Sequence, residues 1–126
     1  MGYYTRYGLE VFVDQDNSVD IVNRMLDETE KYKFYPFEYS LRNTLERIKE
    51  YSNNYNFELE SSDETKWYEH EDEMKELSKI FPNTLFKLHG EGEENGDIWD
   101  KYFLNGKIQE CYAKLTIDPF DKDKLK

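Results

Sequence analysis

Apolar and polar side chains alternate over residues 3–13. The odd-numbered positions carry Tyr, Thr, Leu or Val, whereas Arg6 and Glu10 stand between them. Successive side chains of a strand point to opposite faces of a sheet. The pattern therefore predicts a strand with one buried face.

Three later segments have apolar residues three and four positions apart, which is the spacing of a helix with one buried stripe. They predict helices over residues 18–32, from Ser40 to about residue 52, and over 68–81. Polar residues at 14–18 supply N-cap candidates for the first helix, and Ser40 is the expected cap of the second. The expected stripes are Val19, Val22, Met25, Leu26 and Thr29, then Leu41, Leu45 and Ile48, then Met74, Leu77 and Phe81.

Two shorter segments are less regular. Pro36 interrupts an aromatic run at 34–39, which predicts either an edge strand or a connector. Phe57 and Leu59 alternate with glutamates and allow a short strand, which a loop at 61–64 follows.

The last third of the chain predicts a three-stranded antiparallel meander. Alternating segments at 84–94, 97–104 and 107–117 are separated by Asn95-Gly96 and Asn105-Gly106. Asn-Gly is a favoured two-residue turn of type I′, in which both central residues have positive φ.

These turns also predict the register and the buried face. The second turn places Trp99 opposite Tyr112, Lys101 opposite Glu110 and Phe103 opposite Ile108. The first turn places Leu88 opposite Phe103, His89 opposite Tyr102, Glu91 opposite Asp100, Gly92 opposite Trp99 and Glu94 opposite Asp97. The expected buried face is Phe86, Leu88, Trp99, Phe103, Ile108 and Tyr112. The expected exposed face is Lys87, His89, Glu91, Glu93, Asp100, Tyr102 and Gln109.

These elements predict a single α+β domain over residues 1–117. An antiparallel sheet would end in the three-stranded meander, with two or three helices packed on one of its faces. Residues 118–126 are expected to form a frayed tail.

The composition argues against several classes of protein. The 126 residues include 28 acidic and 17 basic side chains, for a net charge of −11, and 17% are aromatic. Aromatic content this high argues against a disordered chain. The acidity argues against direct binding to a nucleic-acid backbone, which needs Lys and Arg. The chain shows neither a secretory signal pattern nor an apolar run long enough for a membrane span, so a cytoplasmic location is expected.

Nearly all of the excess negative charge falls in two segments. Residues 58–76 have a net charge of −7 and residues 91–100 a net charge of −5, which leaves +1 for the rest. Four acids of the first segment suit the start of a helix, where the helix dipole favours anions. They are Glu69, Glu71, Asp72 and Glu73.

The second segment is harder to explain by local structure. In the expected register, Glu91 opposes Asp100 and Glu94 opposes Asp97, and directly opposed like charges destabilise a hairpin. Either the hairpin tip is splayed and simply exposed, or its negative field has a use. That use would be a bound cation or a basic protein surface; the order of acids does not match an EF-hand loop.

Familiar catalytic motifs are incomplete in this chain. The run His70-Glu71-Asp72-Glu73-Met74 begins like a zincin helix but has Met where the second zinc ligand is needed. Cys111 and His89 resemble a nucleophile and base, although Asp100 opposite the thiol would raise its pKa. Another alternative is a stacking platform for a single nucleotide, made of Trp67, Tyr68, Trp99, Tyr102 and Phe103. No catalytic residue, cofactor or metal is predicted.

Within residues 66–107, a third of the chain, four stretches resemble a known group of proteins. They read KWYEHEDEM (66–74), FP (81–82), LHGEGEENGDIW (88–99) and YFLNGK (102–107). They resemble small proteins of phages and other mobile elements that have a YubB-like, ferredoxin-type domain. The resemblance implies a ferredoxin-like sandwich and a mobile-element setting, in which small acidic proteins often inhibit host defence, as anti-CRISPR proteins do.

The leading hypothesis is a non-enzymatic acidic inhibitor that occupies a basic surface of a defence effector, such as a CRISPR nuclease. Its expected contact residues are Glu91, Glu93, Glu94, Asp97 and Asp100, with Glu69, Glu71, Asp72 and Glu73. Three alternatives stay open. One is an immunity protein for a cationic toxin nuclease, and another is a protein that sequesters a nucleotide signal. The third is a small hydrolase that uses His89, Glu91, Asp100 and Tyr102.

Overall fold

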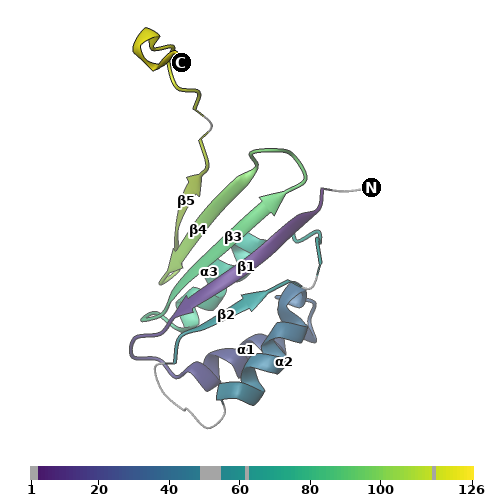
Figure 1. The fold of residues 1–126 in the computed structure, drawn as a ribbon. Helices are drawn as coiled ribbons and strands as arrows, with labels where there is room; N and C mark the ends of the chain where they lie inside the picture. The colour runs from purple at the N-terminus through teal and green to yellow at the C-terminus, as the bar shows by residue number, and fades with distance from the viewer. Residues whose placement is uncertain (1–2, 49–54, 62, 115) are drawn as a thin grey trace.

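The computed structural model describes residues 3–48, 55–61, 63–114 and 116–126 of the chain. The elements are, in chain order, β1 (Thr5–Phe12), α1 (Ser18–Thr29), the 3₁₀ turn η1 (Tyr35–Phe37), α2 (Glu38–Ile48), β2 (Phe57–Glu60), α3 (His70–Ile80), β3 (Leu85–Gly92), β4 (Ile98–Leu104), β5 (Lys107–Tyr112) and the 3₁₀ turn η2 (Lys122–Lys124). The five strands form one antiparallel sheet in the order β2-β1-β3-β4-β5 (Figure 1). The predicted α+β class with a C-terminal meander is confirmed.

One hydrophobic core joins the sheet to the helices. Alternate residues of β1 and β2 are buried, as the sequence pattern predicts. The buried stripes of the helices pack against them in the same cluster, and α3 lies behind β3 and β4 (Figure 1). The helix pair α1 and α2 packs beside β2 at one edge of the sheet. The largest fully buried side chains of this core are Trp67, Phe37, Phe86 and Phe103.

The first helix begins where the sequence predicts and ends earlier. The side chain of Asn17 accepts hydrogen bonds from the backbone N–H groups of Val19 and Asp20, at 2.9 and 3.2 Å, and so caps α1. The helix ends at Thr29 instead of residue 32. Lys31 N and Tyr32 N donate to the carbonyl oxygens three residues earlier, at 2.9 and 3.0 Å, and Tyr32 has a left-handed backbone with φ of 62°, which a helix cannot continue through.

Ser40 does not cap the second helix, which corrects the prediction. The turn η1, with Pro36 near its start, runs directly into α2, so the helix begins at Glu38. Proline is favoured in the first turn of a helix. Pro36 therefore marks the start of a helical segment, and the edge strand considered for residues 34–39 is not formed. Ser40 lies inside α2, where its hydroxyl accepts a hydrogen bond from Glu60 N of β2 at 3.2 Å. The end expected at 52–54 lies outside the described residues.

The two hairpins of the meander differ. Around Asn105-Gly106 both residues have positive φ, at 47° and 79°, and the predicted β4–β5 register is confirmed. In the first hairpin only Gly96 has positive φ. Gly92 N donates to Asp97 O at 2.8 Å, so the strands are joined by a five-residue loop at 93–97 instead of a two-residue turn.

The longer loop shifts the β3–β4 register by two residues, so the predicted pairs of this hairpin are wrong. Glu91 faces Ile98, and Asp100 faces His89, so the expected repulsion between Glu91 and Asp100 does not occur. Glu94 and Asp97 both lie within the loop, where Asp97 N donates to Glu94 O at 3.1 Å.

The same shift changes which glycine lies beneath Trp99. Gly90, and not Gly92, is its cross-strand partner. A Cβ atom at Gly90 would lie 2.2 Å from the Trp99 ring, so the close approach of the indole explains this glycine.

A shift of two residues leaves every side chain on its predicted face. Phe86, Leu88, Trp99 and Phe103 are buried, and Ile108 is partly buried. Tyr112 is an exception, because its side chain is 55% exposed. It lies on β5, the edge strand, none of whose described residues is buried.

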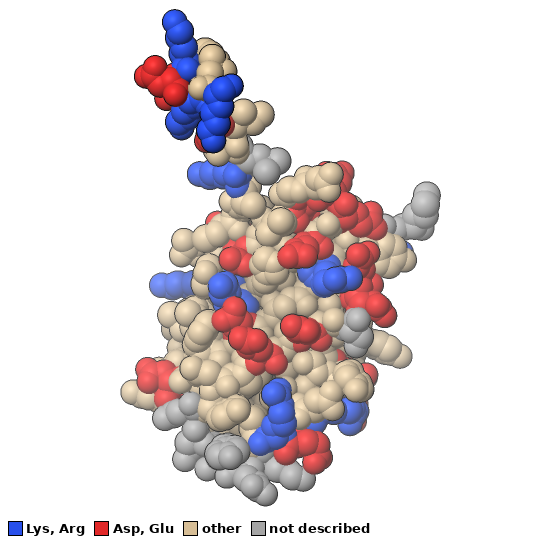
Figure 2. Space-filling view, viewed as in Figure 1, with Lys and Arg blue, Asp and Glu red and all other residues tan. Residues whose placement is uncertain are grey.

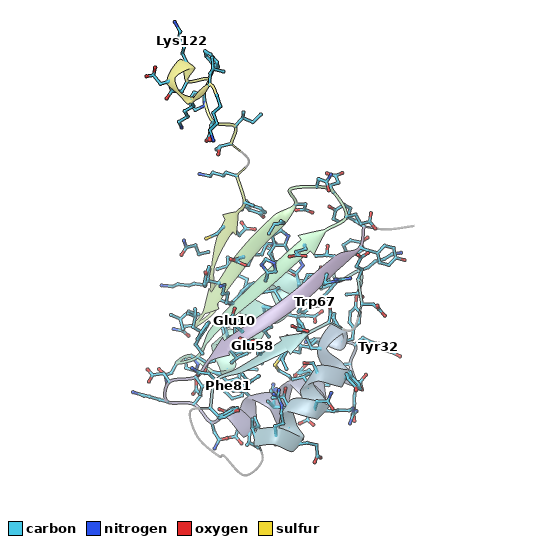
Figure 3. All side chains as sticks on the ribbon, viewed as in Figure 1. Glu10, Tyr32, Glu58, Trp67, Phe81 and Lys122 are labelled. Atoms are coloured by element: carbon cyan, nitrogen blue, oxygen red, sulfur yellow. The ribbon has the colours of Figure 1, made fainter. Side chains whose placement is uncertain are left out.

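Beyond β5 the chain leaves the body of the fold (Figure 1). Strand β5 ends at Tyr112, and residues 116–126 are exposed, with η2 as their only regular element. Lys122 lies far from the sheet (Figure 3).

Candidate protein-binding surface

One face of the sheet is not covered by any described helix. Its side chains come from the alternate strand positions that point away from the core. They include Arg6 and Glu10 of β1, Glu58 and Glu60 of β2, Lys87, His89 and Glu91 of β3, Asp100 and Tyr102 of β4, and Gln109 and Cys111 of β5. Gly8 of β1 occupies the same face without a side chain. Figure 2 views this face and shows carboxylates over its middle and at the end where the chain begins. Glu10 and Glu58 lie on neighbouring strands of it (Figure 3).

Tyr3 holds the β3–β4 loop against the start of β1. Its hydroxyl donates to Asp97 Oδ2 at 2.5 Å and accepts from Glu94 N at 3.0 Å. The next residue, Tyr4, donates from its backbone N–H to Glu93 Oε1 at 3.0 Å. Glu93 and Asp97 therefore serve the fold directly, whereas the Glu94 side chain is exposed to solvent.

The first acidic segment reaches the same end of the molecule. Thr5 and Thr65 exchange backbone hydrogen bonds of 2.8 and 2.9 Å, which brings the loop at 63–66 beside β1. Arg6 Nη2 lies 3.9 Å from Glu64 Oε1, and Lys66 Nζ lies 5.0 Å from the centre of the Tyr4 ring. The two acidic segments thus meet around the first residues of β1.

The open sheet face and this end form one acidic surface, which we call the acidic face. Within the described chain it has ten carboxylates, and the cations among or beside them are Arg6, Arg47, Lys66 and Lys87. The carboxylates are Glu10, Glu58, Glu60, Asp63, Glu64, Glu91, Glu93, Glu94, Asp97 and Asp100. All five hairpin residues predicted to contact a partner belong to it.

The four predicted contact residues around the start of α3 lie outside the acidic face. Helix α3 packs on the opposite side of the sheet, so these acids do not extend the sheet face. Glu73 Oε1 accepts from Trp67 Nε1 and Phe34 N, both at 2.9 Å, and burial raises the pKa of its carboxyl. Glu71 accepts from Lys101 Nζ at 2.9 Å. Only Glu69 and Asp72 of this group are exposed.

Behind the sheet, a buried lysine anchors α3 to β4. Lys101 is 4% exposed, and its Nζ atom lies 4.3 Å from the centre of the Trp99 ring. It donates to Glu71 at 2.9 Å and lies 3.8 Å from Glu110 Oε1. Its third polar contact is His70 Nε2, at 2.8 Å.

The backbone fixes the tautomer of His70. Its Nδ1 atom lies 2.8 Å from the carbonyl oxygen of Trp67, which only accepts, so Nδ1 carries the proton and Nε2 accepts from Lys101. The imidazole is stacked on Trp99 with ring centres 5.3 Å apart. Burial lowers the pKa of His70, and Lys101 lowers it further, against the opposing hydrogen bond with Trp67. The zincin-like run therefore contributes a neutral histidine to a structural cluster.

His89 lies near the middle of the acidic face. Its Nδ1 atom is 2.7 Å from Asp100 Oδ1, and its Nε2 atom is 3.2 Å from Glu91 Oε1. Burial lowers the pKa of His89, but these two hydrogen bonds outweigh it and raise the pKa above its usual value. With a carboxylate on each nitrogen, the ring has no free lone pair for a substrate proton. Asp100 also lies between His89 and Cys111 in the sheet, so the two do not form a nucleophile–base pair.

The stacking platform considered for a nucleotide is not present. Trp67, Trp99 and Phe103 are at most 7% exposed and belong to the core. Tyr68 is exposed and precedes α3, whereas Tyr102 lies on the open sheet face. These rings do not share a surface on which a base could stack.

The described chain has no cluster of three or more His, Cys, Asp or Glu residues suited to a metal ion. An open groove of about 440 Å³ lies beside β2 and is lined by residues such as Glu10, Arg47 and Phe57. No described helix is both long and apolar enough to cross a bilayer. Comparison with protein-family models, with curated proteins and with solved structures finds no match.

Proposed function

We propose that this protein is a non-enzymatic binding protein that docks its acidic face on a positively charged protein surface. The observation that carries the proposal is the gathering of ten carboxylates, with few cations among them, on one surface that the helices leave uncovered. Such a field speeds encounter with a basic partner and disfavours acidic ones. Since several of these carboxylates are not needed for folding contacts, partner binding accounts for their concentration better than stability does.

The finer proposal concerns the partner. A basic groove that holds nucleic acid is lined by Lys and Arg, and the acidic face carries the opposite charge. We propose that the partner is a nucleic-acid-binding effector such as a CRISPR nuclease, inhibited inside the host cell. The resemblance of residues 66–107 to YubB-like, ferredoxin-type proteins of phages supports this setting. An immunity protein for a toxin nuclease would use the same surface.

Enzymatic alternatives have less support. The hydrolase would need His89 as a base, but Asp100 and Glu91 occupy both of its ring nitrogens. The nucleotide-binding alternative would need Trp67 and Trp99 at the surface, and both are buried.

Two matched variants test the proposal. The face variant changes four exposed acids of the acidic face, as Glu58→Gln, Glu60→Gln, Asp63→Asn and Glu94→Gln. The helix variant removes the same charge from exposed acids outside that face, as Asp27→Asn, Glu30→Gln, Glu69→Gln and Asp72→Asn. None of these eight side chains has an ion pair within the described structure, so both variants should fold.

Each protein serves as bait in a lysate of a defence-competent host. Wild type and the helix variant should retain the same nucleic-acid-binding protein, the face variant should lose it, and an added oligonucleotide should displace it. Equal capture by both variants, or capture indifferent to the oligonucleotide, would contradict the proposed mode of binding.

A further inference from the structure

Gly8 has no structural reason to be a glycine. It lies in the middle of β1, where glycine weakens a strand. Its φ is not in the left-handed region, and it pairs without a bulge with Glu60 on one side and His89 on the other. A Cβ atom added here would meet only Leu59 O, at 3.9 Å, which is ordinary van der Waals contact.

The other sheet glycines differ from Gly8 in this respect. A Cβ atom at Gly90 would lie 2.2 Å from the Trp99 ring, and one at Gly92 would lie 2.0 Å from Asp97 Oδ2. Their neighbours exclude a side chain, whereas the neighbours of Gly8 leave room for one. A glycine without a local cause is typical of a place where another molecule approaches the backbone closely.

Two adjoining hollows lie over Gly8, of about 190 and 280 Å³. Both are bounded by Gly8 itself, by Glu60 across one neighbouring strand and by His89 across the other. The first hollow extends toward Glu10, Glu58 and Lys87, and the second toward Arg6 and Glu91. The missing side chain of Gly8 thus leaves a hollow in the middle of the acidic face.

The charges around this hollow favour a cation. Lys87 Nζ lies 3.7 Å from Glu10 Oε1, and both nitrogens of His89 are bonded to carboxylates. Glu58 and Glu60 have no ion pair within the described chain, and both are exposed. They stand two residues apart on the same face of β2, about 7 Å along the strand. An extended cationic side chain could lie over Gly8 with its head group between them.

We infer that the hollow over Gly8 receives an arginine side chain of the basic partner, an inference that rests on the proposed function. The aliphatic stem would cover the bare backbone of Gly8, and the guanidinium would reach Glu58 and Glu60. Arginine suits the site better than lysine, because its planar fork donates to two carboxylate oxygens at once and is more weakly hydrated.

The test fills the hollow without changing the charge. Gly8→Val adds a strand-favouring side chain that the backbone accommodates, and Gln109→Val places the same side chain elsewhere on the open face. The probe is a hexa-arginine peptide, titrated calorimetrically into each protein. We expect about tenfold weaker binding for Gly8→Val and none of this loss for Gln109→Val, since one bidentate charged contact is lost. Wild-type affinity in Gly8→Val would overturn the inference.

Backbone amide shifts of the wild-type protein give a second test that needs no substitution. The peptide should shift the resonances of Gly8, Glu60 and His89, and hexa-lysine should bind more weakly. Shifts confined to the loop at 93–97, or equal affinity for both peptides, would overturn the inference and leave the proposed function standing. Peptide binding that is as strong in the face variant as in wild type would instead remove the proposed function.

Discussion

The buried ammonium group of Lys101 anchors α3 to β4, so one residue determines much of how this helix is attached to the sheet. Alternation along β4 places it on the buried face between Trp99 and Phe103, and a cation is the least expected residue there. In the structure, the buried ammonium group contacts Glu71, His70 and the Trp99 ring, which compensate for its removal from water. From the sequence alone, its place on the buried face was predictable, but its partner from α3 was not. That partner depends on how the helix packs across the sheet.

Removing this charge should loosen the attachment of α3. Lys101→Met keeps the apolar stem but leaves the partly buried Nε2 atom of His70 without a donor, which costs about 1–3 kcal/mol. Glu71 can turn to solvent and adds little. Urea unfolding should show this loss, while Lys79→Met, at an exposed helix position, stays within about 0.5 kcal/mol of wild type. An unchanged unfolding free energy for Lys101→Met would contradict a structural role of the cluster.

The two histidines should make stability depend on pH in opposite directions. The pKa of His70 is lowered in the fold by burial, so its contribution is present above the unfolded value of 6.5 and is lost as pH falls through the folded pKa. The pKa of His89 is raised in the fold, where its hydrogen bonds to Asp100 and Glu91 outweigh burial. Its contribution is present below 6.5 and is lost as pH rises through the folded pKa.

Single substitutions separate the two effects. In unfolding experiments between pH 5 and 8, His70→Gln should remove part of the loss of stability on the acidic side. His89→Gln should flatten the decrease on the alkaline side. If either variant follows the wild-type pH profile in parallel, the corresponding histidine does not titrate as its surroundings indicate.

At the scale of elements, the β3–β4 hairpin shows what the sequence could and could not predict. Alternation gave the strands and their faces correctly, because a shift of two residues changes no face. The Asn-Gly signal did not distinguish a two-residue turn from the loop at 93–97. The deciding contacts come from Tyr3, more than ninety residues earlier in the chain, and a local pattern cannot contain them.

Tyr3→Phe tests these contacts. Without its hydroxyl, Asp97 loses a donor and Glu94 N loses an acceptor, so the unfolding free energy should fall. Amide exchange at Glu94 and Asp97 should become faster, while β4 and β5 keep their protection. Tyr4→Phe is the control, because the described contacts of Tyr4 use its backbone and its ring. Equal exchange in the two variants would contradict a role of the Tyr3 hydroxyl in ordering the loop.

At the scale of the whole molecule, the acidic segments along the chain were predictable from the sequence, but their arrangement on the molecular surface was only partly predictable. The sequence located both acidic segments, and the structure joins the second to the loop at 63–66 and to the open sheet face. The acids around the start of α3 lie outside the acidic face, and Glu71 and Glu73 accept hydrogen bonds within the fold. A pattern along the chain cannot separate these groups, because α3 packs on the opposite side of the sheet.

The most direct test of the acidic face is the rate at which the hexa-arginine peptide associates with the matched variants. Stopped-flow measurements from 50 to 500 mM salt cover a decrease of the screening length from above 10 Å to about 4 Å. At low salt the face variant should associate about tenfold more slowly than wild type and show a weaker salt dependence, and the helix variant should resemble wild type. Equal rates for the two variants would show that only net charge matters, and would contradict the assignment of binding to the acidic face.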